Sequence, residues 1–289
     1  MDDVVAKKEI SWPAVSILIF NHVLGIVGIY YAIRYPSLSI IVAAVVYFFL
    51  CHLSIAFLHR GFTHKAFRVA WPIAILTMTL FSAVAEATAR WWKGKHIDHH
   101  IFSDIPGKDP HTPLDGFYHS QMGWLTTKEG VGPPTKRSLR ANRSDSMDRA
   151  VLWQEKYHWQ LSFLMIFVTP TAIGWLLGDA LGGFLVIGFA RLLFQNHCTW
   201  FVNSIGHTFG ERPMKNVLAT NFSNWPLGLP IFGILTVGES HHANHHMNAN
   251  TWRLGTRWYH FDVAAWVIQL LIWLGLATDC SKNTTSNEV

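Results

Sequence analysis

Cysteines and charged residues are both scarce in this sequence, and the two shortages narrow the class of protein. Only 3 of the 289 residues are cysteine. Cys51 and Cys198 lie in apolar segments and Cys280 in a polar tail, so nothing indicates a disulfide framework or an oxidising compartment. Charged residues make up 14% of the chain and hydrophobic residues 50%, with 14 tryptophans and 19 phenylalanines. This composition predicts an integral membrane protein with aromatic side chains at the membrane interfaces.

The sequence also lacks a recognisable cleavage site near its N-terminus. Lys7 and Lys8 precede a long apolar run, but no small-residue cleavage site follows a short hydrophobic region. We therefore expect a retained first membrane span rather than a signal peptide. The net charge of +5 is explained, in so apolar a chain, by lysines and arginines on cytoplasmic segments, so no nucleic-acid partner is expected.

Four apolar runs approach the roughly 20 residues that a helix needs to cross a bilayer. They cover residues 11–33, 38–58, 159–177 and 180–202. Short connections join the first run to the second and the third to the fourth, which predicts two hairpins of spanning helices. The fourth run is the least apolar, and we expect its Arg191 to face the bundle interior or to snorkel.

Three further apolar stretches, residues 71–88, 222–237 and 262–277, are predicted to lie at the membrane interface instead. If the first of them crossed, the histidines before it and those after it would lie on opposite sides of the membrane and could not share metals. Glu86, Pro226 and Pro230 also disfavour a crossing.

The resulting prediction is an all-α integral membrane protein that forms a single domain over residues 1–289. Four transmembrane helices would carry a cytoplasmic helical cap made of residues 59–158 and 203–280. Basic residues place the cap on the cytoplasmic side, and they are Arg60, Lys65, Arg68, Lys93 and Lys95.

Histidine is the abundant residue, and 9 of the 17 histidines fall into four short clusters. These nine are His59, His64, His96, His99, His100, His207, His242, His245 and His246. Positions i, i+3 and i+4 share one face of a helix, so each of the two His-x-x-His-His triplets can direct three imidazoles to one point. Nine imidazoles exceed the needs of one tetrahedral zinc. The pattern predicts two metals with four or five nitrogens each.

The first cluster sits at the end of the second predicted span. His59 and His64 are about 140° apart on an α-helix, so they cannot share a helix face. Gly61 resembles a helix C-terminal stop. We therefore expect His59 on the last helical turn and His64 on the backbone that follows.

Three polar residues are expected beside the ligands. Asn203 lies one helical turn before His207 and is expected either to contact a ligand or to reach the metal through a water, and Glu239 is expected to orient an imidazole. Asp98 lies inside the second cluster, where it either hydrogen-bonds an imidazole or faces solvent.

Other interpretations of the clusters agree less well with the same residues. A histidine-rich solvated loop is a poor match for two triplets and a third cluster at a helix end. Glu155 and Glu239 each begin a Glu-x-x-His motif of soluble di-iron bundles, but that site needs two more inward glutamates, which the chain does not place suitably. Imidazole suits zinc, copper, iron and nickel. An all-imidazole site at a membrane surface favours oxygen activation by iron.

At these residues the chain resembles the membrane fatty-acid desaturases of the stearoyl-CoA desaturase type, over nearly its whole length. The matching motifs are His59/His64, Trp92 with the second triplet, Asn203-Ser204 with His207, and Gly238-Glu239 with the third triplet. Further matches are Thr199-Trp200, Gly123-Trp124, Asp109-Pro110-His111 and residues 274–277.

The resemblance implies a mushroom of four spanning helices under a cytoplasmic cap, with two irons on the nine histidines and Asn203 holding a water. It implies oxygen-dependent desaturation of a saturated acyl chain, favoured as acyl-CoA, with a cis double bond at Δ9. Electrons would come from cytochrome b5 or from a ferredoxin with its reductase. The active site would face the cytoplasm, in a bacterial inner membrane rather than the endoplasmic reticulum.

One departure from the family bears on the acyl carrier. The acyl-CoA branch has an arginine pair after Asp-Pro-His, whereas this chain has Thr112-Pro-Leu-Asp115, which removes cations suited to the CoA phosphates. The remaining candidates for head-group contact are Lys93, Lys95 and Trp92, with the basic residues 136–143. An acyl-lipid desaturase therefore stays open as an alternative.

Three other functions also stay open on the same histidines. They are a fatty-acyl hydroxylase on the same scaffold, a histidine-rich metal transporter, and a membrane cytochrome that pairs His22 with His52.

Overall fold

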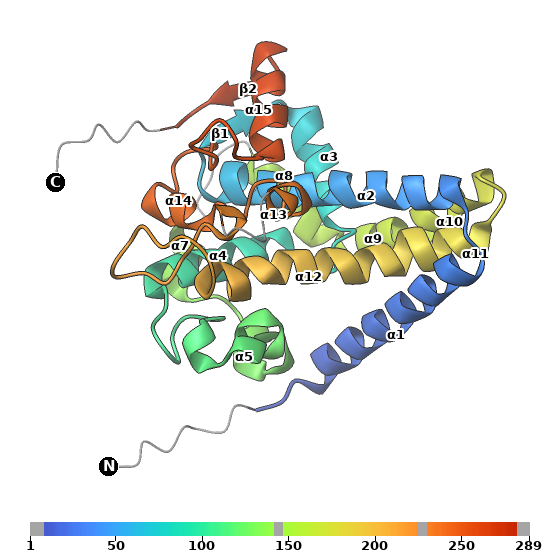
Figure 1. The fold of residues 1–289 in the computed structure, drawn as a ribbon, viewed down its shortest axis with the longest axis horizontal. Helices are drawn as coiled ribbons and strands as arrows, with labels where there is room; N and C mark the ends of the chain where they lie inside the picture. Colours follow the sequence, from blue (N-terminus) through green and yellow to red (C-terminus); the bar gives the residue numbers. More distant parts are fainter. Residues whose placement is uncertain (1–8, 142–146, 225–229, 282–289) are drawn as a thin grey trace.

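The computed structural model describes residues 9–141, 147–224 and 230–281. Over these residues the chain is mostly helical, and the strands β1 (Phe67–Val69) and β2 (Ala277–Asp279) pair antiparallel with Phe67 opposite Asp279. Figure 1 shows long helices running side by side toward one end of the molecule and shorter elements gathered at the other end. Lys7, Lys8, Arg143 and the tail beyond residue 281 lie outside the described residues.

The long helices follow the predicted spans closely, but three of them contain π-helical turns. α1 is Trp12–Arg34, and α2, Leu38–Phe57, continues as the π-helical segment Leu58–Thr63. The third consists of α9 (His158–Phe163), the π-helical segment Leu164–Val168 and α10 (Thr169–Leu176). The fourth consists of α11 (Ala180–Gly182), the π-helical segment Gly183–Ala190 and α12 (Arg191–Ser204).

Three of these helices are long and apolar enough to cross a membrane. They are Trp12–Arg34, Leu38–Thr63 and His158–Leu176, with mean hydropathies of 1.8, 2.5 and 1.4. These three, together with the low charge content, confirm the prediction of a membrane protein. The fourth helix, residues 180–204, carries more polar side chains, and its crossing stays a prediction.

The polar side chains of α12 point into the bundle. Arg191 is buried and its Nη1 donates to the carbonyl of Ala83 and to Gln195 Oε1, at 3.0 and 2.9 Å. Asn196 Nδ2 donates to the carbonyl of Val84 at 3.0 Å. These groups therefore do not face lipid, which agrees with the expectation for Arg191.

Glycines let α1 approach the fourth helix closely. A Cβ on Gly28 would lie 2.2 Å from the carbonyl oxygen of Leu185, and one on Gly25 would lie 2.6 Å from Leu193 Cβ. Small residues permit such backbone contact between membrane helices. The connection from α1 to α2 and the connection from α10 to α11 lie at the same end of the molecule in Figure 1, as two hairpins require.

The helices predicted to lie at the interface are short. α3 (Trp71–Phe81) and α15 (Val263–Trp273) have 11 residues each, or about 16 Å of rise, against a hydrocarbon core of about 30 Å. α13 is Ile231–Leu235, and residues 225–229 before it are outside the described part. Figure 1 shows α15 running across the direction of α2. Neither α3 nor α15 is long enough to cross.

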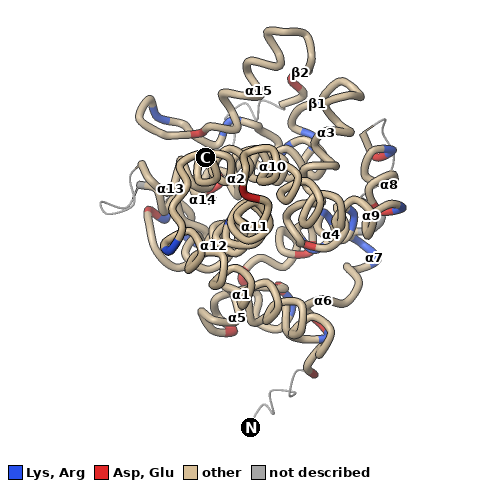
Figure 2. The backbone as a smooth tube through the Cα atoms, turned by 90° about the vertical axis from the view of Figure 1, so that its right-hand side faces the viewer, with Lys and Arg blue, Asp and Glu red and all other residues tan. Residues whose placement is uncertain are grey.

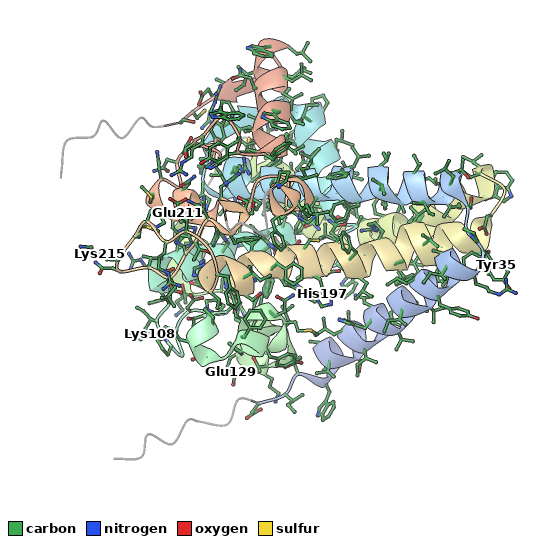
Figure 3. The ribbon with its side chains drawn as sticks, viewed as in Figure 1. Tyr35, Lys108, Glu129, His197, Glu211 and Lys215 are labelled. Carbon is green, nitrogen blue, oxygen red and sulfur yellow. The ribbon has the colours of Figure 1, made fainter. Side chains whose placement is uncertain are left out.

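The end opposite the hairpin turns holds most of the remaining elements. These include α4 (Ala89–Phe102), α5 (Phe117–Gln121), α6 (Lys128–Val131), α7 (Lys136–Ala141), α8 (Asp148–Lys156) and α14 (His242–Met247). Figure 3 places Lys108, Glu129, Glu211 and Lys215 at this end and Tyr35 at the other. Along the helix axes, Figure 2 shows few charged residues on the long helices and more on the surrounding elements.

An apolar core lies where α2 meets α3, α4 and α8. Its buried members include Leu58, Phe62, Met78, Phe81, Ala89 and Val151. This core fixes the end of α2 against α4, and these two elements carry the first two histidine clusters.

Candidate metal centre

A π-helical turn brings the first two histidines together. The backbone N–H of His64 donates to the carbonyl of His59 at 3.1 Å, an i→i+5 bond that places His64 one turn above His59. Their ring centroids are 5.1 Å apart. Two predictions are therefore wrong, because both assumed α-helical geometry. The two histidines do share a face, and Gly61 lies inside the π-helical segment rather than ending a helix.

The nine clustered histidines converge into two groups. The five-histidine group contains His59, His64, His96, His100 and His245, and the four-histidine group contains His99, His207, His242 and His246. Within each group the candidate ligand atoms lie within 4.8 Å of one another. The i, i+4 pair of each triplet stays together, whereas the middle histidine, His99 or His245, joins the other group.

The facing atoms are Nε2 nitrogens in every case. In the five-histidine group the Nε2–Nε2 distances are 3.0 Å for His59–His245, 2.8 Å for His64–His96, 3.0 Å for His96–His100 and 2.8 Å for His100–His245. In the four-histidine group they are 3.2 Å for His99–His246, 2.9 Å for His207–His242 and 3.1 Å for His242–His246. Two ligands about 2.1 Å from one metal and at right angles are about 3.0 Å apart. The spacings therefore fit a metal in each group.

Three carboxylates fix the protonation of the imidazoles that they contact. The Nδ1 atoms of His59, His99 and His207 lie 2.6, 2.9 and 2.9 Å from Glu239, Asp109 and Asp104 respectively. A carboxylate only accepts, so each Nδ1 carries the hydrogen and each Nε2 presents a lone pair. An imidazole binds a metal through such a bare nitrogen, so these three contacts leave three Nε2 atoms ready for a metal.

Burial keeps the other imidazoles neutral, which is the form that binds metal. It lowers the pKa of all six well below the ordinary value of 6.5, namely His64, His96, His100, His242, His245 and His246. The pKa of His99 is raised instead, because the charge of Asp109 outweighs the effect of burial.

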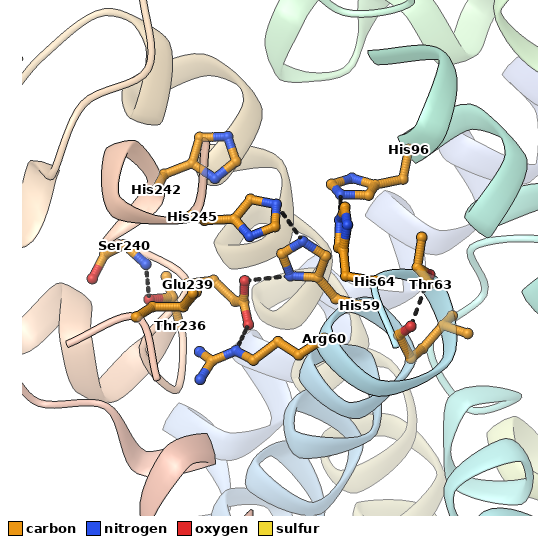
Figure 4. Close-up of polar contacts among 12 residues, drawn as sticks. His59, Arg60, Thr63, His64, His96, Thr236, Glu239, Ser240, His242 and His245 are labelled. Atoms are coloured by element: carbon orange, nitrogen blue, oxygen red, sulfur yellow. Dashed lines mark hydrogen bonds and ion pairs between the residues drawn. The ribbon is translucent and has the colours of Figure 1, made fainter. Parts of the chain in front are cut away.

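Glu239 joins the five-histidine group to a buried arginine (Figure 4). Arg60 Nε donates to Glu239 Oε1 at 2.9 Å, and its Nη1 donates to Asp262 Oδ1 at 2.7 Å and to the carbonyl of Trp252 at 2.8 Å. Burial would raise the pKa of Glu239, but Arg60 and His59 lower it to about 2. Glu239 thus contacts an imidazole as expected, whereas Arg60, expected to mark the cytoplasmic face, has no exposed surface.

The predicted head-group residues are engaged inside the protein. Lys93 and Lys95 are buried, with Nζ atoms that donate to Asp148 Oδ1 at 3.0 Å and to the carbonyl of Glu129 at 3.1 Å. The indole of Trp92 stacks on His96, with centroids 5.2 Å apart. Neither ammonium is exposed, so their placement does not support contact with a head group.

The other predicted neighbours of the site have different outcomes, and the role of Asn203 stays a prediction. Asp98 is buried and accepts from the backbone N–H and the hydroxyl of Thr135, so it neither contacts an imidazole nor faces solvent. Asn203 lies in the last turn of α12, and its carbonyl accepts from Ser120 Oγ at 2.9 Å. Glu155 forms an exposed pair with Arg90 at 3.2 Å, which agrees with a structural role.

Sequence reasoning missed Asp104 and the role of Asp109. Asp109 is also close to His99 and His111 in a third cluster of possible ligands. A metal there would compete for the Nδ1 of His99, which already contacts Asp109. The clue in the sequence was two aspartates within ten residues of the second triplet, in an otherwise charge-poor chain.

Comparisons with known proteins agree with the motifs. Residues 11–275 match the family model described as fatty acid desaturase. Acyl-CoA desaturase 1 of Saccharomyces cerevisiae is 31% identical over 89% of this chain and 49% of its own length. Stearoyl-CoA desaturase 5 of Bos taurus is 26% identical over 96% of this chain and 82% of its own. Hex-5-enoyl-[acyl-carrier protein] acetylenase of Moorena producens is 28% identical over 78% and 72%. The chain spans about half the length of the yeast relative.

Proposed function

We propose that this chain, which belongs to the fatty acid desaturase family, desaturates a saturated fatty acyl chain to give a cis double bond. The observation that carries the proposal is the convergence of nine histidines into groups of five and four. We assign one iron ion to each group. We also propose that residues 180–204 form a fourth span, and that residues 59–158 and 203–280 form a cytoplasmic cap in the same domain.

Bound iron would supply the oxidant, derived from O2, that takes one hydrogen from each of two adjacent methylenes. The balance requires two electrons from an outside donor and two protons from solvent, and it yields the alkene and two waters. The protein's own groups hold the site in place. Glu239, Asp104 and Asp109 keep three imidazoles in the tautomer whose Nε2 is bare, and Trp92 covers one face of His96.

We favour acyl-CoA as the substrate and Δ9 as the position of the double bond. The names of the yeast and bovine relatives support acyl-CoA. For the electron donor we propose cytochrome b5 or a ferredoxin with its reductase. The location that we propose is a bacterial inner membrane, with the site on the cytoplasmic side.

A second carrier is favoured by one observation. The family's arginine pair is absent, and Lys93 and Lys95 are buried, so neither that pair nor these two lysines can meet the CoA phosphates. A lipid-esterified chain has no CoA phosphates to be met, and the name of the Moorena relative gives acyl carrier protein as a further carrier. The carrier is therefore the part of the proposal that the experiment must decide.

The test is reconstitution in lipid vesicles with iron, a reductant and one stearoyl donor at a time: stearoyl-CoA, stearoyl-phospholipid or stearoyl-acyl carrier protein. We expect a Δ9 cis-monoene from stearoyl-CoA by mass spectrometry. His99→Ala should abolish it, and His22→Ala, which alters a histidine outside both groups, should leave activity. Conversion of phospholipid alone refutes the acyl-CoA substrate, and a hydroxylated product alone refutes desaturation.

A further inference from the structure

We propose that residues 103–111 form a carboxylate clasp, in which Asp104 and Asp109 position two imidazoles of the four-histidine group. Breaking the clasp is expected to release the metal of that group and to spare the other. The inference rests on the proposed two-metal function and assigns a role to two residues that the metal ligands alone do not explain.

Asp109 is the inner half of the clasp. Its carboxylate lies 2.9 and 3.0 Å from the Nδ1 of His99 and accepts from the backbone N–H of Asp104 at 2.8 Å and of His111 at 3.1 Å. The residue is buried. One carboxylate therefore shapes the loop after α4 and holds the imidazole at the end of α4.

Asp104 is the second carboxylate of the clasp, and it contacts the chain around His207 and Leu218. Its Oδ1 accepts from the Nδ1 of His207 at 2.9 Å, and its Oδ2 accepts from the backbone N–H of Leu218 at 2.7 Å. Its φ of +61° lies in the left-handed region, which aspartate tolerates better than most residues. Because Asp109 accepts from the N–H of Asp104, the two carboxylates are mechanically coupled.

The clasp touches only one of the two groups. His99 and His207 both belong to the four-histidine group, and Asp104 and Asp109 are the only carboxylates bonded to that group among the described residues. The five-histidine group has a separate partner, Glu239, which Arg60 holds from the other side. A defect in the clasp is therefore expected to act on one metal position.

Asparagine cannot replace either aspartate fully. Both oxygens of each carboxylate accept from N–H donors. An amide has one accepting oxygen, and its NH2 would face a donor. The substitution keeps the side-chain size, so its main effect is on these contacts. Loss of such a partner of a metal-binding histidine costs about 10–100-fold in metal affinity.

The test compares full-length wild type with Asp104→Asn, Asp109→Asn and Glu239→Gln, each loaded with 57Fe in detergent. Iron per chain is measured against rising chelator concentration, and Mössbauer spectra identify which iron remains. We expect both aspartate variants to lose one iron at about 10–100-fold less chelator than wild type, and to keep the second. Glu239→Gln should lose the other iron first. Glu211→Gln, an exposed carboxylate paired with Arg257, is the control and should match wild type.

Three results overturn the clasp: a wild-type release profile in both aspartate variants, simultaneous loss of both irons, or loss of the same iron as in Glu239→Gln. Size-exclusion profiles and the unfolding temperature of the metal-free proteins separate misfolding from selective release. If one aspartate variant misfolds, the other is loaded with zinc, and its metal per chain against rising chelator concentration decides the question. Wild type that holds fewer than two irons refutes the two-metal function itself, and the clasp with it.

Discussion

Replacing Arg60 with methionine should destabilise the protein more than any surface charge change. Arg60 is fully buried at the end of α2 and donates to Glu239, Asp262 and the carbonyl of Trp252. Methionine fills similar space but removes all three contacts. Asp262 keeps donors from the backbone N–H groups of three residues, Leu254, Gly255 and Ala265. Glu239 keeps only His59, so the loss is concentrated beside the five-histidine group.

The magnitude follows from the uncompensated charge. Removing one partner of a buried ion pair costs about 3–5 kcal/mol. At about 2–4 °C per kcal/mol for a chain approaching this size, the unfolding midpoint should fall by roughly 10 °C. The double variant Arg60→Met/Glu239→Gln should recover part of this loss, because the remaining buried group is neutral.

The assay is thermal unfolding of the metal-free protein in one detergent, followed by intrinsic tryptophan fluorescence. Arg257→Met is the control, since Arg257 forms an exposed pair with Glu211, and its midpoint should stay within experimental scatter. A fall of less than about 2 °C for Arg60→Met, below the cost of a broken buried pair, would contradict the reasoning. So would a double variant less stable than the single one.

Three further predictions concern other parts of the fold. Burial raises the pKa of Glu86 to about 7 despite the hydrogen bond from Trp92, so the fold favours the neutral carboxyl. Stability should therefore fall by about 3 kcal/mol as pH rises from 4.5 to 7, and unfolding midpoints of Glu86→Gln should lack most of this fall. Gly28→Val should lower the midpoint, because a Cβ there would lie 2.2 Å from the carbonyl of Leu185, and an unchanged midpoint would contradict the packing of α1. In a cysteine-free background, Tyr35→Cys and Lys215→Cys should be labelled from opposite sides of the membrane, and labelling from one side would refute the two hairpins.

Hydropathy and spacing were sufficient for the larger features of the fold. The apolar runs predicted α1, α2 and the third helix within one or two residues, because a membrane span must be long and apolar regardless of its partners. The π-helical turns were not predictable in this way. A π turn adds one residue to a helical turn without changing composition, and so the relation of His59 to His64 was predicted wrongly.

The histidines of the site were found from spacing, but their grouping was not. Helical geometry pairs His96 with His100 and His242 with His246, and the structure keeps both pairs. That His99 and His245 change groups depends on how α4 and α14 face each other, which is a tertiary property. Arg60 was predicted at the cytoplasmic surface for a different reason. Charged residues are rarely buried unless they are paired, and a local sequence pattern does not reveal a partner about 180 residues away.

The exchange of middle histidines has a structural consequence. α4 supplies two imidazoles to the five-histidine group and one to the four-histidine group, and α14 supplies one and two. Neither group can therefore form unless both helices are in place, and a shift of either helix disturbs both groups. The clasp and Arg60 support different parts of the centre, since the clasp ties α4 to the chain around His207 and Arg60 ties the end of α2 to the segment before α14. The two histidine groups therefore form together on folding, while the clasp and the Arg60–Glu239 pair each support one group. A carboxylate substitution is for this reason expected to remove one metal, whereas displacement of a helix would remove both.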